Sequence, residues 1–522
     1  MNMPRFTVDE IVRVTRASHH PPDEAGGRSS KSGDGAAACS SISTDSRSIE
    51  AGGLFFALSG PNFDGHDFLT DVASAGAFGA VVRRGSESIP KLRGRMHLFE
   101  VDEPLISLGG LARLYRDRFP SLHLAAVTGS NGKTTTKEML ASVLSSVGRG
   151  LKSEGNFNNR IGVPWTLFRL RSDYRWAVIE MGMNEPGEIA DLAEMARPAV
   201  GLVTTASAMH LEGLGGVDAV ARAKAELYES LPDGAVAVVN LDDLRLPSLA
   251  ESAGAIEAGG RLRRVTYGLH PRADVRLGDV EIGDDCTLRF QILVGRVDAL
   301  LPPRARSGRA EGKGGPTILQ VRLRLLGRHN AHNACGALAT ALAMGVQPEQ
   351  AAEALADMPG LPRRLEMKPG PGGSVIIDDC YNAGPASVRA ALQTSAELAA
   401  VRGGRLFAIL GDMLELGERE DAYHREMGRA AVEFGAKLLV TFGDRSAMAG
   451  EAAREAGLGD VAHEDAPEPV MEHVREAVRP KDVILVKGSR GLAMERIADP
   501  LTEAADENDS SVLSGNGKEG GP

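Results

Sequence analysis

The stretch that most constrains this chain is a glycine-rich run, Thr128-Gly129-Ser130-Asn131-Gly132-Lys133-Thr134-Thr135. An apolar segment typical of a strand (122–127) precedes it, and a segment typical of a helix (134–147) follows it. A turn of this kind lets backbone N–H groups bind a phosphate. Lys133 can then reach the outer phosphates of a nucleotide, and the Thr134 hydroxyl can hold Mg²⁺. The run therefore predicts a nucleotide-binding loop.

The run departs from the strict phosphate-loop pattern, which has a glycine five residues before Gly132, where this chain has Val127. The alternative interpretation is a helix-capping turn that happens to contain a lysine. Because both flanks are those that the motif requires, we favour nucleotide binding.

Length, composition and charge are those of an ordinary globular protein. At 522 residues, the chain should hold about three domains of ~100–200 residues each. Its hydrophobic fraction of 43% and charged fraction of 25% are typical values. The formal charge of −11 argues against a nucleic-acid binder, because the phosphate backbone requires a basic surface.

Targeting signals and paired cysteines are not found in the sequence. No apolar run approaches the ~20 residues that cross a bilayer, so we expect no membrane span, and the N-terminus lacks the pattern of a signal peptide. The four cysteines are widely scattered and show no CxxC spacing. We therefore expect reduced thiols in a cytoplasmic protein and no zinc site.

Alternating strand-like and helix-like segments predict an α/β fold with three domains. The first domain (1–102) carries short β-like segments, and the second (103–358) carries the phosphate loop on a parallel sheet. The third (359–502) begins at a Pro-rich bend and is a Rossmann-like α/β series. Three Gly-, Ser- or charge-rich stretches are expected to be disordered, namely 19–38, 302–316 and 503–522.

The expected strands of the last two domains are short apolar runs. Those of the second domain are 122–127, 176–181, 200–205 and 235–239, and strands and helices should alternate to about Met358. Those of the third are 374–378, 405–410, 437–442 and 482–486. Two α/β domains joined at a Pro-rich hinge indicate a cleft that closes on a substrate.

Glu180 is placed at the carboxyl end of an expected strand, where functional groups of open α/β sheets collect. Beside a phosphate loop, such a carboxylate could hold Mg²⁺ or orient water. A solvated acid at a strand end is an equally good interpretation. His210 follows the next strand, but a lone histidine is more often structural than functional.

Lys224 interrupts an apolar helix face. Val217, Val220, Lys224 and Leu227 are spaced 3, 4 and 3 residues apart, so they share one face of a helix. A buried ammonium is costly unless it is paired, neutralised or chemically altered. The alternative, which the pattern slightly favours, is snorkelling, in which the stem packs inward and the charge reaches water.

Two further groups of polar residues are candidates. Asn330 and Asn333 precede an alanine-rich helix, which they could cap, or they could bind a base or a phosphate. Asp378 and Asp379 follow a strand of the third domain. Paired aspartates at a strand end favour a functional role over a structural one.

Together these motifs resemble the Mur ligase family, the ATP-dependent amino-acid-adding enzymes of bacterial cell-wall precursor synthesis. The loop matches the family's short TGxNGKT form, which accounts for the missing first glycine. The resemblance extends from about Ser43 to Ile497. It rests on Ser43-Thr44-Asp45-Ser46-Arg47, Asp64-Gly65-His66, Gly155-Asn156-Phe157-Asn158-Asn159 with Gly162 and Pro164, His210-Leu211-Glu212-Gly213, Ala223-Lys224, Asp379 with Tyr381-Asn382-Ala383, Gly411-Asp412-Met413-Leu414-Glu415-Leu416-Gly417 and Lys487-Gly488-Ser489-Arg490.

The resemblance implies roles for the matching residues around ATP. Residues 128–135 bind its phosphates, with Lys133 on the transferring γ-phosphate. Thr134 and Glu180 hold one Mg²⁺, while His210 and a carbamylated Lys224 hold a second. A carbamate would resolve the inward-facing lysine, because it turns a buried cation into a metal-paired anion.

The resemblance also implies sites for the rest of the nucleotide and for the second substrate. Asn330 would lie near the adenine, and Arg364 and Asp379 would close the third domain over the nucleotide. The first domain would bind a uridine diphosphate, through Ser46 and Arg47. Asn158 and Asn159 would also contact this UDP-linked substrate.

The motif set is most similar to the member type that adds D-alanyl-D-alanine to a UDP-N-acetylmuramoyl-tripeptide through an acyl phosphate. It implies a monomer with small-molecule substrates and no nucleic-acid partner. A ligase adding the third residue, a folylpolyglutamate synthase-like ligase and a P-loop NTPase that drives a partner are the alternatives. Three residues depart from the family pattern: Arg363 replaces a usual Gly, Cys380 a common Ser, and Gly384 the Asn of YNANP.

Overall fold

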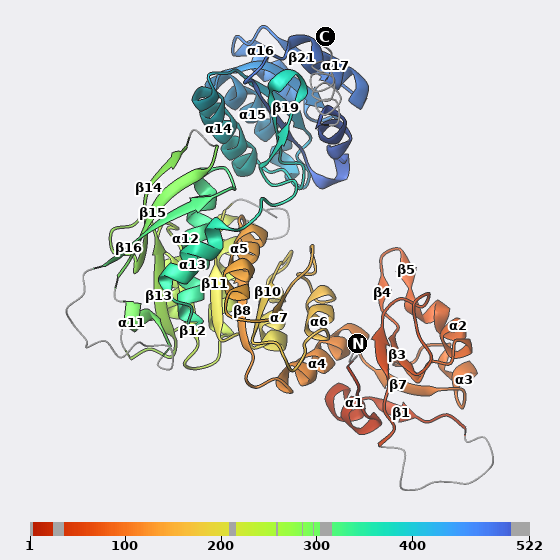
Figure 1. Ribbon diagram of the computed structural model, residues 1–522. Helices are drawn as coiled ribbons and strands as arrows, with labels where there is room; N and C mark the ends of the chain where they lie inside the picture. Colours follow the sequence, from red (N-terminus) through yellow and green to blue (C-terminus); the bar gives the residue numbers. More distant parts are fainter. Residues whose placement is uncertain are drawn as a thin grey trace, which may run out of the picture.

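In the part of the chain that the structure describes, three large sheets follow one another along the sequence, beside a separate two-stranded hairpin (Figure 1). The computed structural model describes residues 4–23, 36–207, 216–256, 259–283, 286–295, 297–302 and 316–502. Among these residues, no helix is long and apolar enough to span a membrane. The α/β fold expected from the sequence is confirmed.

The N-terminal sheet has five strands in the order β1-β7-β6-β3-β2. β1 pairs with β7 in the antiparallel sense, and the other neighbours are parallel. The strands are β1 (Ser18–His20), β2 (Ser41–Ser43), β3 (Gly53–Phe56), β6 (Gly79–Arg83) and β7 (His97–Val101), with a separate hairpin of β4 (Ser59–Gly60) and β5 (Phe63–Asp64). The helices are α1 (Val8–Thr15), α2 (Leu69–Ser74) and α3 (Ile89–Leu92).

The expectation that 19–38 is a disordered insert is wrong at the start of that stretch. His19 and His20 belong to β1, where His19 pairs with Phe99 in the ladder and stacks on its ring at a centroid distance of 5.0 Å. Ala38 bridges Thr7. The polar composition concealed a short edge strand that aromatic stacking stabilises. Residues 24–35, and most of 302–316 with all of 503–522, lie outside the described residues.

The central sheet has nine strands in the order β16-β15-β14-β13-β12-β11-β8-β10-β9. Neighbours from β9 to β14 are parallel, and β14, β15 and β16 pair in the antiparallel sense. The strands are β8 (His123–Thr128), β9 (Gly150–Lys152), β10 (Trp176–Glu180), β11 (Val200–Val203), β12 (Val236–Asn240), β13 (Arg263–Gly268), β14 (Val275–Ile282), β15 (Leu288–Val294) and β16 (Thr317–Leu323).

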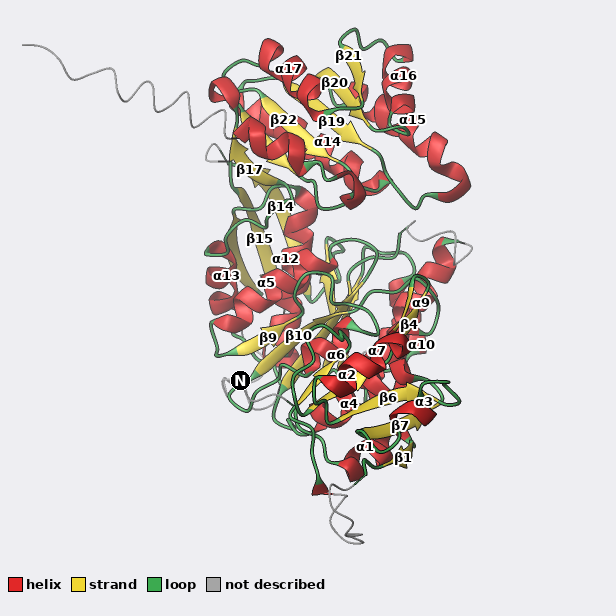
Figure 2. Cartoon of the chain, turned by 90° about the vertical axis from the view of Figure 1, so that its right-hand side faces the viewer, coloured by secondary structure: helices red, strands yellow, loops and turns green. Residues whose placement is uncertain are grey.

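Helices cover both faces of this sheet (Figure 2). They are α4 (Pro104–Asp117), α5 (Lys133–Ser145), α6 (Gly162–Leu167), α7 (Glu188–Ala196), α9 (Val217–Glu229), α10 (Leu246–Ser252), α11 (Val297–Leu300), α12 (Arg328–Ala343) and α13 (Pro348–Ala356). Alternate residues of β8 enter different cores, with Leu124 and Ala126 in one and Ala125 and Val127 in the other. Burial on both faces explains why this strand reads as a continuous apolar run.

The expected alternation of strands and helices to Met358 is wrong between β13 and β16. There the chain forms consecutive strands, interrupted after β15 by the one-turn helix α11. In β15 and β16, buried residues alternate with more exposed ones, which is the pattern of a sheet with one wet face. That period of two was present in the sequence and predicts strands.

The C-terminal sheet has six strands in the order β17-β18-β22-β19-β20-β21, and all neighbours except β17 and β18 are parallel. The strands are β17 (Glu366–Pro369), β18 (Val375–Asp378), β19 (Leu406–Gly411), β20 (Ala436–Phe442), β21 (Val461–Glu464) and β22 (Val483–Lys487). The helices are α14 (Pro385–Arg402), α15 (Glu420–Glu433), α16 (Ala447–Glu455) and α17 (Pro467–Ala477).

The hairpin of β14 and β15 reaches the C-terminal part of the chain (Figure 1). Its Ile282 and Cys286 pack in one apolar cluster with Val388 and Leu392 of α14. Arg328, at the start of α12, also lies 3.4 Å from Glu397 of α14. The antiparallel extension is therefore an apolar contact between the central and C-terminal sheets, in addition to the covalent connection.

Arg363, which departs from the usual Gly of the family pattern, has a φ of 59°. This left-handed conformation favours glycine, so an arginine here is strained by itself. Its guanidinium lies 3.3 Å from Glu495 and 3.1 Å from Asp499. These ion pairs fix the segment that follows the Pro-rich bend to the last described helix of the chain.

Candidate functional site

The glycine-rich run forms a tight turn between β8 and α5. Gly129 has a φ of 141° and Gly132 a φ of 81°. A Cβ on Gly129 would lie 2.0 Å from Thr204 Oγ1, and one on Gly132 would lie 2.4 Å from Asn333 Oδ1. Both positions therefore require glycine for conformation and for space.

Hydrogen bonds to the segment that follows β11 hold the turn in place. The Ser130 N–H donates to the Thr205 carbonyl at 2.8 Å, and the Asn131 amide donates to Ser207 Oγ at 2.9 Å. The Thr204 hydroxyl donates to the Asn131 carbonyl at 2.6 Å. These bonds preorganise the turn without any ligand.

The N-terminus of α5 is open to an anion. Within the described part of the chain, the N–H groups of Gly132, Lys133 and Thr134 enter no hydrogen bond. Three such groups at the start of a helix form an anion-binding site. Thr128 and Thr135, at the two ends of the run, are buried, and the Thr128 hydroxyl donates to the Met181 carbonyl at 2.7 Å.

Lys133 folds back over this turn. Its ammonium donates to the carbonyls of Gly129 at 2.7 Å and Ser130 at 3.1 Å. Burial lowers the pKa of Lys133, while the negative charge of Glu180 opposes that shift and the positive charge of Arg364 adds to it. The amine therefore lies within electrostatic reach of one residue from the central sheet and one from the C-terminal segment.

Glu180 is not the solvated acid of the alternative interpretation, because it is 2% exposed at the end of β10. Its Oε1 accepts a hydrogen bond from the Asn158 amide at 3.0 Å. Its Oε2 is buried and receives no hydrogen bond. A buried carboxylate oxygen that lacks a hydrogen bond, beside a phosphate loop, fits a hard divalent cation such as Mg²⁺.

Lys224 is buried in α9 with 1% exposure, so the snorkelling interpretation is wrong. Within the described ranges, no carboxylate lies within ion-pair distance of its amine. Burial, together with the like charge of Lys133, lowers the pKa of Lys224 to about 7. Val220 and Leu227 on the same face are fully buried, so the packing of the helix leaves the stem no route to water. A neutral, buried amine can react with carbon dioxide.

His210 lies outside the described residues, as does the whole of 208–215. In the described part of the chain, no group of three or more His, Cys, Asp or Glu could hold a metal ion. A metal site built on Glu180 would therefore need hydroxyl, carbamate or phosphate ligands as well.

Asn330 and Asn333 do not cap α12, whose N-cap is Gly327. Asn330 is buried, and its amide donates to the Leu326 carbonyl at 2.7 Å. The Asn333 amide donates to Asn330 Oδ1 at 3.0 Å, while its own oxygen faces Gly132. The pair therefore connects α12 directly to the phosphate loop.

The C-terminal candidates form a compact group of their own. The Arg364 guanidinium lies over the Tyr381 ring at 4.1 Å. Asp379 accepts the Leu365 N–H at 3.1 Å and binds Lys487 at 2.6 Å. Lys487 is 2% exposed, and we did not single it out from the sequence, although the Lys487-Gly488-Ser489-Arg490 motif contained it.

The four candidate residues for UDP binding lie in two separate parts of the structure. Arg47 is exposed after β2, where it pairs with Asp45 at 2.8 Å. Asn158 contacts Glu180, next to the phosphate loop. Asn159 accepts the N–H groups of Ile161 at 3.1 Å and Gly162 at 2.8 Å, which orders the start of α6. Ser46 is part of the turn that Asp45 and Arg47 form, and no described contact joins it to the loop.

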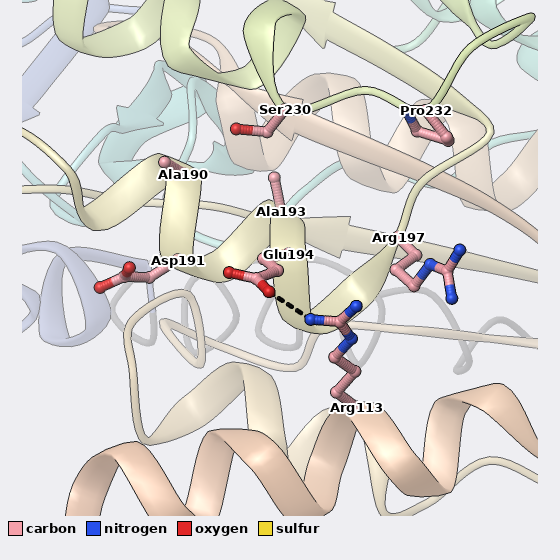
Figure 3. Close-up of a pocket in the computed structure, with 8 residues that line it drawn as sticks. All are labelled: Arg113, Ala190, Asp191, Ala193, Glu194, Arg197, Ser230 and Pro232. Carbon is pink, nitrogen blue, oxygen red and sulfur yellow. Dashed lines mark hydrogen bonds and ion pairs between the residues drawn. The ribbon is translucent and has the colours of Figure 1, made fainter.

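A surface pocket of about 360 Å³ lies elsewhere on the central sheet (Figure 3). Arg113 of α4 is ion-paired to Glu194 there, and the other lining residues are Ala190, Asp191, Ala193, Arg197, Ser230 and Pro232. Arg197 precedes β11 and Pro232 precedes β12, so the pocket is at the amino ends of these strands. The phosphate loop is at their carboxyl ends, which is where α/β sheets bind ligands, so the pocket does not mark the site.

We expect Gly129→Ala to weaken nucleotide binding strongly and to lower the melting temperature, because the added methyl group clashes with Thr204 at a positive φ. Thermal unfolding and titration with ADP measure the two effects. Gly234→Ala is the matched control, since Gly234 has a φ of 79° but open space around it. Equal effects of the two variants on ADP binding would contradict the tight packing of the turn.

Comparisons with known proteins match three family models to this chain. They are the catalytic domain of the Mur ligase family at 39–91, the Mur ligase middle domain at 127–341 and the Mur ligase glutamate ligase domain at 363–490. MurF from Acinetobacter baumannii, a crystal structure 28% identical in sequence, superposes with a TM-score of 0.78 over 96% of this chain and 100% of its own. MurF from Thermotoga maritima, solved in complex with ADP, is 24% identical with a TM-score of 0.73 over 90% and 98%, which shows the fold alone.

Two curated relatives carry the name UDP-N-acetylmuramoyl-tripeptide–D-alanyl-D-alanine ligase. The one from Escherichia coli K12 is 33% identical over 471 residues, which are 88% of this chain and 93% of the relative. The one from Mycobacterium tuberculosis H37Rv is 34% identical over 509 residues, which are 90% and 93% of the two chains. Identity at this level over nearly the full length of both proteins establishes common descent, and the chain belongs to the Mur ligase family.

Proposed function

We propose that this protein uses ATP to join D-alanyl-D-alanine to UDP-N-acetylmuramoyl-tripeptide, giving the pentapeptide precursor of peptidoglycan. Two relatives that are 33% and 34% identical over most of both chains bear the name of that activity. The observation that carries the proposal is the electrostatic grouping of Lys133, Glu180 and Lys224 beside the free N–H groups of the phosphate loop. A scaffold protein that only bound a nucleotide would not need two buried charged groups and a half-buried lysine there.

The reaction begins when the terminal carboxylate of the tripeptide attacks the γ-phosphorus of ATP. The bond to the β,γ-bridging oxygen breaks, so ADP leaves and an acyl phosphate forms. The amine of D-alanyl-D-alanine then attacks the acyl carbon, and phosphate leaves from the tetrahedral intermediate. Two anions meet in the first step, so neutralising charge and fixing the reactants are the main tasks of the protein.

Each side chain has a definite task in this scheme. The N–H groups at the start of α5 bind the phosphates, with residues 128–135 shaped around them, and Lys133 moves from the loop carbonyls to the γ-phosphate. Asn330, held against the loop through Asn333, would meet the adenine. Arg364 and Asp379 would close over the nucleotide from the C-terminal sheet. Ser46 and Arg47 would bind the UDP group in the N-terminal sheet.

Divalent cations fit the remaining groups. Thr134 and Glu180 would hold one Mg²⁺, and His210 with a carbamylated Lys224 would hold a second. Bound Mg²⁺ supplies positive charge that lowers the repulsion between the attacking carboxylate and the triphosphate. Asn158 orients Glu180 for this purpose. Asn158 would therefore contact the UDP-linked substrate near the tripeptide carboxylate that reacts.

The reaction would take place in the cytoplasm, where ATP is available. We propose that the protein acts there as a monomer.

A panel of substrates tests the proposal by phosphate release. The purified protein is given ATP and Mg²⁺ with UDP-linked dipeptides or tripeptides, and with diaminopimelate, lysine or D-alanyl-D-alanine as the amine. We expect release that requires both the UDP-tripeptide and the D-dipeptide. Release with a UDP-dipeptide and a single amino acid would assign the third-residue ligase instead, and release without any amine would assign an NTPase.

A further inference from the structure

A second lysine of α5 lies under the phosphate loop, and the proposed reaction does not use it. Lys137 follows Lys133 by one helical turn and has no exposed surface. Its ammonium lies 3.5 Å from Glu180 Oε2 and 3.2 Å from Glu138 Oε1. Neither contact has hydrogen-bond geometry, and the ammonium has no hydrogen-bond partner. A buried cation of this kind needs a reason, because burying it without full pairing is costly.

Lys137 is part of a row of alternating charges that runs from the site to the surface. The row is Glu180, Lys137, Glu138 and Lys152, and the exposed fractions of the side chains are 3%, 0%, 18% and 42%. Lys152 closes the row by an ion pair to the second oxygen of Glu138. Each internal charge thus has an opposite charge on both sides, and the row is neutral as a whole.

Two groups determine how the Glu180 carboxylate lies. The Asn158 amide donates a hydrogen bond to Oε1, and the Lys137 ammonium attracts Oε2. Without Lys137, only the hydrogen bond from Asn158 would remain, and the carboxylate could rotate about it. Because Glu138 lies on the other side of the ammonium, its charge offsets the repulsion that Lys137 would exert on a divalent cation.

We propose that Lys137 is a positioning residue for Glu180. Its ammonium offsets the buried negative charge of Glu180. It also keeps Oε2 oriented so that this oxygen can bind a divalent cation that arrives with the nucleotide. This inference rests on the proposed function, because it assumes that Glu180 meets the cation of a Mg²⁺–nucleotide complex. In this proposal Lys137 acts through Glu180 and not on the nucleotide itself.

The test compares ADP binding in Mg²⁺ with ADP binding in EDTA, by calorimetry. The dissociation constant in EDTA divided by that in Mg²⁺ measures how strongly the cation strengthens nucleotide binding. We expect Lys137→Met to reduce this ratio about 10- to 100-fold, which is the usual effect of losing a residue that orients a metal ligand. Lys152→Met is the matched control, because it removes the exposed cation of the same row and should leave the ratio unchanged.

The variant Glu180→Gln separates positioning from general stability. In that background, the cation has lost its ligand, so adding Lys137→Met should produce no further change in the ratio. The double variant also removes both charges of the pair, so it remains folded and measurable should Lys137→Met alone fail to fold. An equal ratio in wild type and Lys137→Met, or a further loss in the double variant, would overturn the inference. A wild type in which Mg²⁺ does not strengthen ADP binding would instead refute the proposed function.

Discussion

Lys224→Ala should reduce ligation about 10²- to 10³-fold, the loss that follows removal of one preorganised charged group from a site of this kind. The reason is that the variant removes the amine on which the proposed carbamate forms. The rate of phosphate release with both substrates measures the effect. Added bicarbonate should raise the rate of a wild type that has been depleted of carbon dioxide, and it should not change the rate of the variant.

The stability of a Lys224 variant should change in the opposite direction to its activity. Burial lowers the pKa of Lys224 from 10.5 to about 7. Between these two values the unfolded chain binds a proton that the folded chain does not, so stability rises with pH from about 7 to about 10. Below pH 7 the full cost of the buried amine is present. Lys224→Met should therefore raise the melting temperature at neutral pH and weaken its rise with pH, measured without bicarbonate or metal.

These two measurements together distinguish a functional lysine from a structural one. A structural lysine that holds the fold would lose stability and activity together when replaced. Turnover at the wild-type rate in Lys224→Ala would refute the carbamate. A lower melting temperature in Lys224→Met would show that the amine has a partner that stabilises it.

The sequence predicted the elements that carry the site better than those that surround it. β8 and β10 are buried on both faces, so their apolar runs, and the glycine-rich turn that follows β8, were readable without the fold. β14, β15 and β16 were missed although their period of two was present in the sequence, because each is half-exposed and lacks the continuous apolar run that marks β8 and β10. The edge strand β1 was missed because His19 gains its packing from Phe99, which is about 80 residues away in sequence.

The side chains of the site show a similar division. A helical period indicated the inward face of Lys224, but the pattern could not distinguish snorkelling from burial, because that depends on what α9 packs against. The same limit applies to Lys137, which looks in the sequence like an ordinary helix lysine beside Glu138. Its burial results from the approach of β10 to α5, which brings Glu180 to its ammonium. Long-range pairing of this kind has no local signature.

Lys133→Ala should remove most acyl-phosphate formation, with a loss of about 10²- to 10³-fold in ADP yield per unit time. The Lys133 ammonium donates to the carbonyls of Gly129 and Ser130, so it is held close to the start of α5. Its charge is needed where negative charge collects in the transition state, while the loop N–H groups still bind the phosphates. ADP affinity should therefore fall much less than the rate.

A single-turnover experiment measures the Lys133 step directly. The protein is mixed with ATP, Mg²⁺ and the UDP-tripeptide in the absence of the amine, and the acyl phosphate is trapped with hydroxylamine as the hydroxamate. Lys133→Arg is the matched control, because it keeps the charge but not the compact ammonium, and it should retain more activity than the alanine variant. An unchanged yield of hydroxamate and ADP in Lys133→Ala would contradict the role of this lysine. Such a result would indicate that Arg364, whose positive charge acts on Lys133, neutralises the charge of the γ-phosphate instead.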